Sequence, residues 1–470
     1  MYKTKNKALL MGTITYAIGT FGTKILSFLI VPLYTYFIIP EDLGDYDLLI
    51  TTVSLLSPIL TLKISEATYR WIINNKDNEI QYISATYNLL IKNSITAAIV
   101  LLIINKIIPI WHCYYFIAIL IGDRVLECLQ KLLRGLRNQK LFAVSGVFHT
   151  CIFVFSNLYK ICYLHEGVIA LLQSNILSVF LTIIFILVCE PRLRKVDIFK
   201  NYWTIQKELL SYSAPLVPSA LCWWMMNTSD RYVIRLFLGR YANGIYSVAY
   251  KFPSILTTVF NMFNNAWTDM ALAEIKKGET SNFYVKSIFQ KLYKMSFSLA
   301  ILLIPLTKLI MKLILSSSYK EGAIYVGFLY IGTVFQGLST FCGIGYLHNK
   351  ETKGAAKTSI IGAIANIIID LLFIKSIGLF AASISTCFGF MIMWLLRMKD
   401  FIKVFPFTVD WRELLVYSLT GIFIASITIW TNNKVDIVLV AFGLFNIIVH
   451  NRDTVKNFFR LASKRLSQTR

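Results

Sequence analysis

The sequence consists almost entirely of apolar stretches of about 20 residues or more, separated by short basic connections. A helix of about 20 residues is about 30 Å long, which matches the hydrocarbon core of a bilayer. Only 15% of the 470 residues are charged and 56% are hydrophobic, whereas soluble domains carry roughly 25% charge. We therefore expect an all-α, polytopic membrane protein.

The hydropathy pattern predicts about 14 transmembrane helices. The expected spans are approximately 8–38, 46–73, 83–105, 110–131, 141–161, 167–190, 208–237, 241–270, 283–314, 322–347, 355–375, 377–397, 411–431 and 434–450. With this count, connections on one side hold about 30 Lys and Arg residues and those on the other side about 6, so both termini are predicted to be cytoplasmic. No connection exceeds about 20 residues, which leaves no room for a soluble catalytic domain.

An internal repeat supports a two-lobe organisation. Residues 40–46 (PEDLGDY) resemble 240–246 (RYANGIY), and 167–170 (GVIA) resemble 378–381 (GLFA). The nearly constant offset predicts a six-helix duplication with both copies in one orientation. The expected parts are an N-lobe at 1–195, a basic cytoplasmic linker at 196–207, a C-lobe at 208–405, two further helices at 406–450 and a basic tail at 451–470.

Cationic side chains lie far from the ends of the expected spans. Lys24 lies near the middle of the first span and Lys251 is about 15 Å from the outer end of the eighth. A charge at mid-depth costs at least about 2.5 kcal/mol unless it faces a partner or a wet cavity. We interpret both as cavity-lining groups that face phosphate, with an intrahelical or snorkelling lysine as the alternative for Lys24.

Lys63, Glu66 and Arg70 are spaced i, i+3 and i+7 on one face of the second span. A stripe of charges on an otherwise apolar helix indicates a water-filled lumen. We expect Lys63 and Arg70 to bind substrate and Glu66 to orient these cations or take part in gating. An interfacial cluster of ion pairs is the alternative.

The fourth span carries Asp123, Arg124 and Glu127. Arg124 and Glu127 are i and i+3, so they can pair on one face. Arg124 is either a substrate contact or one half of a structural pair, and Asp123 with Glu127 could share a proton in ion coupling.

Asp230, Arg231 and Arg235 lie toward the outer end of the seventh span, where we expect an outer gate or exit path. Within it we expect Arg231 to bind substrate, and Asp230 and Arg235 to take part in gating. Lys308 and Lys312 form a second basic pair at similar depth. Snorkelling to outer headgroups is the competing interpretation for these cations. Asp269 in the eighth span is a candidate for proton coupling. The eight cysteines are scattered through apolar segments without a C-x-x-C pair, so we expect no metal site, cofactor or disulfide.

The chain resembles the Wzx-type polysaccharide-unit flippases of the multidrug/oligosaccharidyl-lipid/polysaccharide exporter superfamily. The resemblance spans roughly residues 8–400 and is carried by the following segments: GTKIL at 22–26 and SEATYR at 65–70, NTSDRYVI at 227–234, GIYSVAYKFP at 244–253, and GLFAA at 378–382. The related lipid II flippases carry an arginine where this chain has Lys24.

The resemblance implies two six-helix bundles around a V-shaped central cavity that opens alternately to each side. It implies a flippase, not an enzyme, which moves undecaprenyl-pyrophosphate-linked oligosaccharides to the outer leaflet for capsule, exopolysaccharide or O-antigen synthesis. The implied location is the cell (inner) membrane of a bacterium, and the implied partners are the lipid-linked substrate, the bilayer, and glycan polymerase and chain-length regulator proteins. No nucleic-acid partner is expected, because the positive-inside rule accounts for the basic residues.

Other functions remain open at this point. A multidrug or cation antiporter of the same superfamily would need acidic residues at mid-depth in the N-lobe, where the excess here is basic. A lipid II-type flippase is a closer alternative. A membrane glycosyltransferase would need a sizeable outer loop, and a scaffold without transport would not need so many buried charges.

Overall fold

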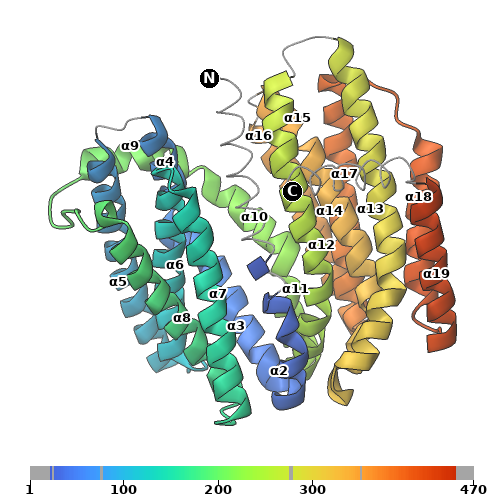
Figure 1. Cartoon of the computed structure of the whole chain (residues 1–470), viewed down its shortest axis with the longest axis horizontal. Helices are drawn as coiled ribbons and strands as arrows, with labels where there is room; N and C mark the ends of the chain where they lie inside the picture. The colour runs from blue at the N-terminus through green and yellow to red at the C-terminus, as the bar shows by residue number, and fades with distance from the viewer. Residues whose placement is uncertain (1–21, 24–25, 75–77, 275–278, 350–351, 451–470) are drawn as a thin grey trace, which may run out of the picture. The chain divides into compact units, whose positions relative to one another are not determined.

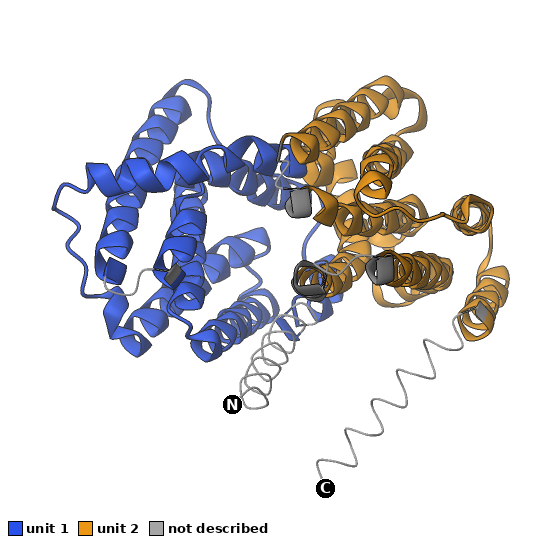
Figure 2. Cartoon of the chain, turned by 90° about the horizontal axis from the view of Figure 1, so that it is seen from above, with its two compact units in different colours: residues 1–224 blue, residues 225–470 orange. Residues whose placement is uncertain are grey.

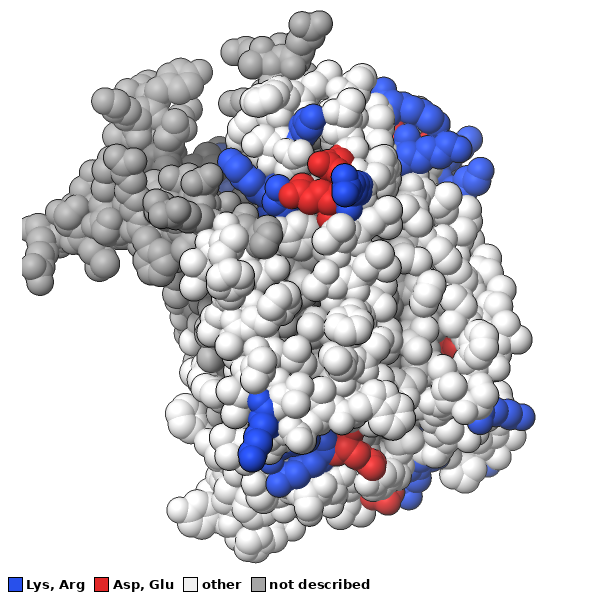
Figure 3. Space-filling view, turned by 90° about the vertical axis from the view of Figure 1, so that its right-hand side faces the viewer, with Lys and Arg blue, Asp and Glu red and all other residues white. Residues whose placement is uncertain are grey.

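The computed structural model describes residues 22–23, 26–74, 78–274, 279–349 and 352–450. The described residues are almost entirely helical and contain no strand (Figure 1). Within them, 8 helices are long and apolar enough to cross a membrane. On the face shown in Figure 3, charged side chains gather at the two ends and leave a wide, nearly uncharged band between them. The prediction of an all-α polytopic membrane protein is confirmed.

The chain divides into two compact units, Met1–Trp224 and Met225–Arg470 (Figure 2). The helices described in the first unit are α2 (Val31–Phe37), α3 (Pro40–Thr61), α4 (Ile64–Asn74), α5 (Glu79–Ile107), α6 (Cys113–Gly135), α7 (Gln139–Cys162), α8 (Val168–Cys189), the short η2 (Pro191–Leu193), α9 (Trp203–Ser213) and α10 (Leu216–Thr228), whose last turn enters the second unit. The finer domain boundaries expected from the sequence stay a prediction.

The core of the first unit lies where α4, α5, α6 and α8 pack together, and α9 closes its end. Ile64, Ile83 and Leu132 are fully buried there, and Leu209 of α9 is buried in the same cluster. Gln206 of α9 fixes this contact, because its side-chain amide donates to the backbone oxygen of Ala85 at 3.0 Å and to Asn88 Oδ1 at 2.9 Å. The short helix α9 is therefore docked on α5.

An apolar groove of about 470 Å³ runs along another side of the first unit, between α5, α6 and α8. It is lined by Tyr87, Leu90, Ile91, Ser94, Ile95, Ala98, Ile99, Leu102, Ile121, Val125, Cys128, Leu129, Ile183 and Leu187. Ile91, Ile95 and Ile99 are exposed on it. Such a surface suits contact with lipid chains.

The second unit consists of α11 (Asp230–Phe237), α12 (Gly239–Glu274), α13 (Glu279–Ile314), η4 (Ser317–Ile324), α14 (Val326–Cys342), α15 (Ile344–Asn349), α16 (Thr352–Ile377), α17 (Leu379–Val404), α18 (Trp411–Ile427) and α19 (Asn433–His450). Helices α14 and α17 pack closely because Gly332 faces the Cys387 backbone, where an added Cβ would lie 3.1 Å from Cys387 Cα. Buried aromatic side chains, including Phe297 and Phe335, fill the space around α14.

The structure divides some spans that the sequence predicts as continuous. The expected span 46–73 breaks at Leu62–Lys63, between α3 and α4. The expected span 208–237 consists of part of α9, then α10 and α11. Hydropathy could not reveal these breaks, because it reports how apolar a stretch is and not its backbone conformation. Pro215, between α9 and α10, is a local signal of a break there.

Candidate functional site

The break between α3 and α4 places a cation at a bend in the chain. Leu62 and Lys63 have φ angles of 46° and 55°, a left-handed conformation that costs about 1–2 kcal/mol per non-glycine residue. Contacts hold the break in place: Lys63 N donates to Thr61 Oγ1 at 3.2 Å, and Asn93 Nδ2 of α5 donates to the backbone oxygen of Leu60 at 2.8 Å. Lys63 therefore lies at a turn instead of on a straight helix.

A cavity of about 550 Å³ opens beside this break, within the first unit. Its lining comes from the break, α4, α9 and α10 and consists of Lys63, Glu66, Tyr69, Arg70, Ile73, Tyr212, Leu216, Ser219, Ala220 and Trp223. Its volume lies within the range of about 300–1,000 Å³ typical of small-molecule sites. The predicted stripe Lys63, Glu66 and Arg70 thus lines one cavity.

Aromatic side chains form part of this cavity and hold its helices together. The Arg70 guanidinium lies over the Tyr212 ring, with Cζ 4.8 Å from the ring centroid. Trp71 packs on Tyr212 with ring centroids 5.6 Å apart, and its Nε1 donates to Glu208 Oε1 of α9 at 2.5 Å. The cavity therefore presents cations next to aromatic faces, a combination that favours anionic and ring-shaped groups.

A network of ion pairs lies behind the cavity, on α6. Arg124 Nη1 is 2.5 Å from Glu127 Oε2 and also donates to Ser57 Oγ of α3. Lys131 Nζ is 3.1 Å from Glu127 Oε1 and 2.5 Å from Glu66 Oε1 of α4. The predicted pairing of Arg124 with Glu127 is confirmed, and the network connects α6 to both α3 and α4.

Lys131 is a member of the network that the sequence pattern does not predict, because it is the last residue of the expected span 110–131 and adjoins a basic connection. Its position at i+4 from Glu127 and i+7 from Arg124 is the signal that could have identified it. Its side chain is only 18% exposed, so it lies among the helices and not in the loop.

The network leaves the cavity with unbalanced positive charge. Glu66 is paired with Lys131, and Glu127 is paired with Arg124 and Lys131. Within the described residues, Lys63 and Arg70 make no ion pair. Cations of α6 therefore neutralise the Glu66 and Glu127 carboxylates. Lys63 and Arg70 face the space where a ligand would bind.

The remaining predicted groups of the first unit are placed as follows. Asp123 is half-buried on α6 and makes no hydrogen bond or ion pair within the described part of the chain. Lys24 lies outside the described residues, so its place at the site stays a prediction.

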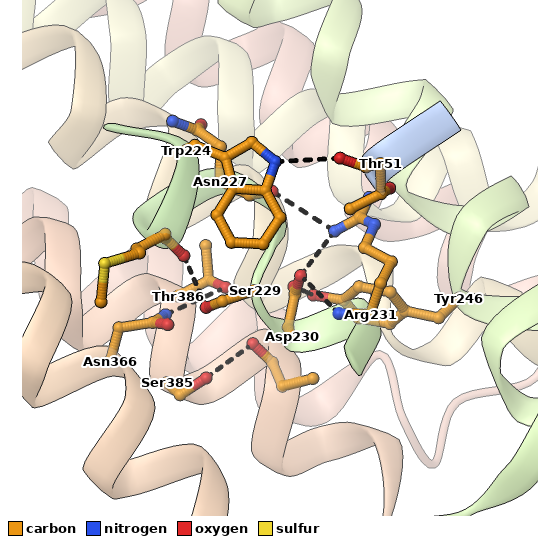
Figure 4. A network of polar contacts seen from close by, with 12 residues as sticks. Thr51, Trp224, Asn227, Ser229, Asp230, Arg231, Tyr246, Asn366, Ser385 and Thr386 are labelled. Carbon is orange, nitrogen blue, oxygen red and sulfur yellow. Dashed lines mark hydrogen bonds and ion pairs between the residues drawn. The ribbon is translucent and has the colours of Figure 1, made fainter. Parts of the chain in front are cut away.

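In the second unit, Asp230 and Arg231 form a buried ion pair, with Asp230 Oδ1 2.7 Å from Arg231 Nη1 (Figure 4). Tyr246 Oη of α12 donates to Asp230 Oδ2 at 2.5 Å, and the Arg231 guanidinium lies 4.2 Å from the ring centroid of Tyr250. Snorkelling of Arg231 to the outer surface is wrong, because Arg231 is 3% exposed and turned toward α12. Its role in a gate stays a prediction.

Asp370 of α16 is a second residue that the sequence did not single out as functional. It is 1% exposed, and neither carboxylate oxygen has a hydrogen-bond partner within the described residues. Asn366, one turn earlier on α16, donates to Thr386 Oγ1 of α17 at 3.4 Å (Figure 4). Because a buried carboxyl group without a partner is costly in a membrane segment, Asp370 is a candidate functional position.

Further charged candidates of the second unit lie on α11 and α12. Lys251 is exposed on α12 and makes no ion pair within the described ranges, and Arg235 is half-buried on α11. The side chain of Asp269 lies outside the described part of the structure.

Lys308 is also buried, which contradicts the snorkelling interpretation. Its ammonium lies 3.0 Å from Asp436 Oδ2 and donates to the backbone oxygens of Thr428 and Thr431 at 2.5 and 2.7 Å. The Lys308 and Asp436 side chains are 2% and 0% exposed. This pair fastens α19 and the α18–α19 connection to α13.

Comparison with known proteins decides the family. The model of the polysaccharide biosynthesis protein family matches residues 9–268, more than half of the chain. The chain belongs to this family. An uncharacterized membrane protein of Methanocaldococcus jannaschii is 23% identical over 359 residues, covering 72% of this chain and 68% of that protein.

Solved structures share the fold at low sequence identity. An inward-facing MATE family transporter of the MOP superfamily is similar with a TM-score of 0.62 at 17% identity, covering 88% of this chain and 98% of that one. The lipid II flippase MurJ in an inward closed conformation gives a TM-score of 0.59 at 15% identity, with the same coverage. The predicted family and fold class are confirmed.

Proposed function

We propose that this polysaccharide biosynthesis protein is a flippase for oligosaccharides linked through diphosphate to a polyprenyl lipid. The observation that carries the proposal is the cavity of the first unit, where Lys63 and Arg70 face the ligand space beside the Tyr69, Tyr212 and Trp223 rings. A diphosphate diester carries two negative charges, and sugar rings pack their C–H faces on aromatic side chains. The shared fold of the lipid II flippase agrees with this substrate class.

In the proposed cycle, the diphosphate enters the cavity from the cytoplasmic leaflet and binds Lys63 and Arg70. Lysine binds phosphate as a point charge and arginine binds it through its planar fork. The sugars contact the aromatic lining and the polyprenyl tail stays in the hydrocarbon. Rocking of the two units then exposes the site outward, which requires that the substrate bind both states. Lys24, Lys251 and Arg124 are further contacts in this proposal.

The remaining charged groups have secondary roles in the proposal. Asp123, Glu127 and Asp269 are candidates for proton coupling, with the membrane potential as the alternative energy source. Asp230, Arg231 and Arg235 would control the outer gate. We propose that the protein lies in the cell membrane of a bacterium with both termini in the cytoplasm. The transported glycan would serve capsule, exopolysaccharide or O-antigen synthesis. Glycan polymerase and chain-length regulator proteins are proposed partners.

Flipping in reconstituted vesicles tests the proposal. The substrate is a prenyl-diphosphate-linked oligosaccharide with a fluorophore on the sugar, whose transfer is read by quenching with a membrane-impermeant reductant. We expect Lys63→Glu and Arg70→Glu to reduce flipping to the rate of empty vesicles, and Lys63→Arg to retain most of it. Lys207→Glu is the matched control, because Lys207 is exposed on α9 and does not line the cavity.

Two outcomes would refute the proposal. One is wild-type protein that reconstitutes correctly but does not move the labelled substrate. The other is a Lys63→Glu variant that flips it at the wild-type rate. Transport of an organic cation by the same vesicles would favour the antiporter instead.

A further inference from the structure

We infer that Lys131 sets the electrostatic potential of the cavity, and so its preference for anionic ligands, although Lys131 does not line the cavity itself. Lys131 contacts Glu66, the carboxylate that lines the cavity beside its cations, at 2.5 Å, and Glu127 at 3.1 Å. This inference rests on the proposed function, in which the cavity binds a diphosphate.

The negative charge of Glu66 is directed toward α6 and not toward the cations that line the cavity. Glu66 lines the cavity together with Lys63 and Arg70, and Lys63 lies within electrostatic reach of Glu66, Glu127 and Lys131. The Glu66 carboxylate, however, accepts a hydrogen bond from Lys131 Nζ of α6. As long as Lys131 holds it, Glu66 does not pair with Lys63 or Arg70.

Without the Lys131 ammonium, the Glu66 carboxylate would turn to other cations. Glu127 would keep Arg124 at 2.5 Å, but Glu66 would lose the partner that the structure gives it. Its side chain is 39% exposed and therefore has room to turn. The nearest cations that line the same space are Lys63 and Arg70, so the net charge facing a ligand would fall by one.

Burial makes this effect large. The Lys131 and Arg124 side chains are 18% and 15% exposed, so water screens them only in part. At an effective dielectric constant of about 20, a unit charge about 12 Å away changes the local concentration of a singly charged probe by about tenfold. Lys131 is thus a positioning residue, which acts through Glu66.

The potential can be measured without any substrate. Ser219 lines the cavity, so Ser219→Cys provides a reporter thiol in the full chain in lipid nanodiscs. Anionic and cationic methanethiosulfonates of similar size are compared, and mass spectrometry separates modification at position 219 from that of the native cysteines. The ratio of anionic to cationic reaction rates reports the sign of the local potential.

We expect Lys131→Gln to lower this ratio by about a hundredfold, because the anionic probe loses about a factor of ten and the cationic probe gains about the same factor. Lys131→Arg should keep it within about twofold, and the double variant Lys131→Gln/Glu66→Gln should restore it. Glu66→Gln alone should raise the ratio, which keeps the inference testable if Lys131→Gln does not fold. A fall of less than about threefold in folded Lys131→Gln, or a Glu66→Gln variant without a rise, would overturn the inference.

A binding measurement separates this inference from the proposed function. A soluble short-chain prenyl-diphosphate-linked sugar and the matching prenyl glycoside without diphosphate are titrated against each variant. Lys131→Gln should weaken binding of the first, which carries two negative charges, by about a hundredfold and leave the second unchanged. Equal weakening of both would show a merely structural role. If the thiol ratios behave as expected but wild type does not bind the diphosphate probe, the proposed function fails and the inference stands.

Discussion

The buried pair between Lys308 and Asp436 leads to a quantitative prediction about the C-terminal helices. Lys308→Met removes an ammonium that contacts Asp436 and the backbone oxygens of Thr428 and Thr431. Because both side chains are almost fully buried, the substitution leaves a carboxylate without its counter-ion and carbonyl groups without donors. Breaking a buried pair in this way costs about 3–5 kcal/mol.

The cost should appear locally, because the pair joins α13 to α19 and to the connection before it. A factor of ten in an equilibrium corresponds to about 1.4 kcal/mol. The cost of breaking the pair should therefore increase the fraction of molecules in which α19 is detached by roughly 10²–10³-fold or more. Hydrogen exchange of the purified protein, followed by mass spectrometry, should therefore accelerate by about this factor in peptides from α18 and α19. Peptides of the first unit should exchange at their wild-type rates.

Two variants control for other effects of the substitution. Lys312→Met removes a cation one turn further along α13 whose side chain contacts Asn433 Oδ1 at 3.1 Å. Because Lys312 is only half-buried, we expect less than about tenfold acceleration. The double variant Lys308→Met/Asp436→Leu replaces both charges by apolar groups and should recover most of the protection. If Lys308→Met and Lys312→Met had the same effect, the assignment of a buried, structural ion pair would be refuted.

Further expectations concern backbone conformation and pH. Gly167 and Gly378 precede α8 and α17 with nearly the same conformation, φ 59° and ψ −133° against φ 58° and ψ −138°. Because side chains are strained there, either glycine replaced by alanine should destabilise the folded state by about 1–3 kcal/mol in thermal unfolding. Gly146→Ala, in a helix with open space around it, should not. Glu190 follows the last residue of α8, and hydrogen bonds from Arg192 hold the pKa of Glu190 below its ordinary value of 4.5. Its contribution to stability is present above pH 4.5 and is lost as the pH falls through the lowered pKa, so Glu190→Gln should lower the unfolding temperature at pH 7 and have no effect well below pH 4.5. A Glu190→Gln deficit that persists in acid would contradict this account.

The sequence predicted the fold class and part of the site because both depend on local periodicity. Apolar stretches identified the membrane spans, and i, i+3 spacing identified the pair of Arg124 with Glu127. The resemblance between 167–170 and 378–381 also corresponds to a shared backbone geometry. These features repeat within one helix or one short segment, so they can be read without knowing which helices are neighbours.

The features that the sequence did not predict all depend on contacts between helices. Lys131 looked like a loop residue until α4 placed Glu66 beside it. Lys308 looked like a snorkelling lysine because Asp436, its partner, lies 128 residues away. Whether Lys24 joins the cavity stays a prediction, because it lies outside the described residues.

The groove between α5, α6 and α8 has a consequence for the charges on the neighbouring face of α6. Val125, Cys128 and Leu129 border the groove, while Arg124, Glu127 and Lys131 face α3 and α4. In a bilayer, hydrocarbon would fill the groove and form a wall of low dielectric constant on that side of α6. Such a wall concentrates the field of the charges on the more polar side of the helix, where the cavity lies. The lipid that surrounds the protein would then act on the cavity at a distance, by strengthening the field that a charged ligand meets there.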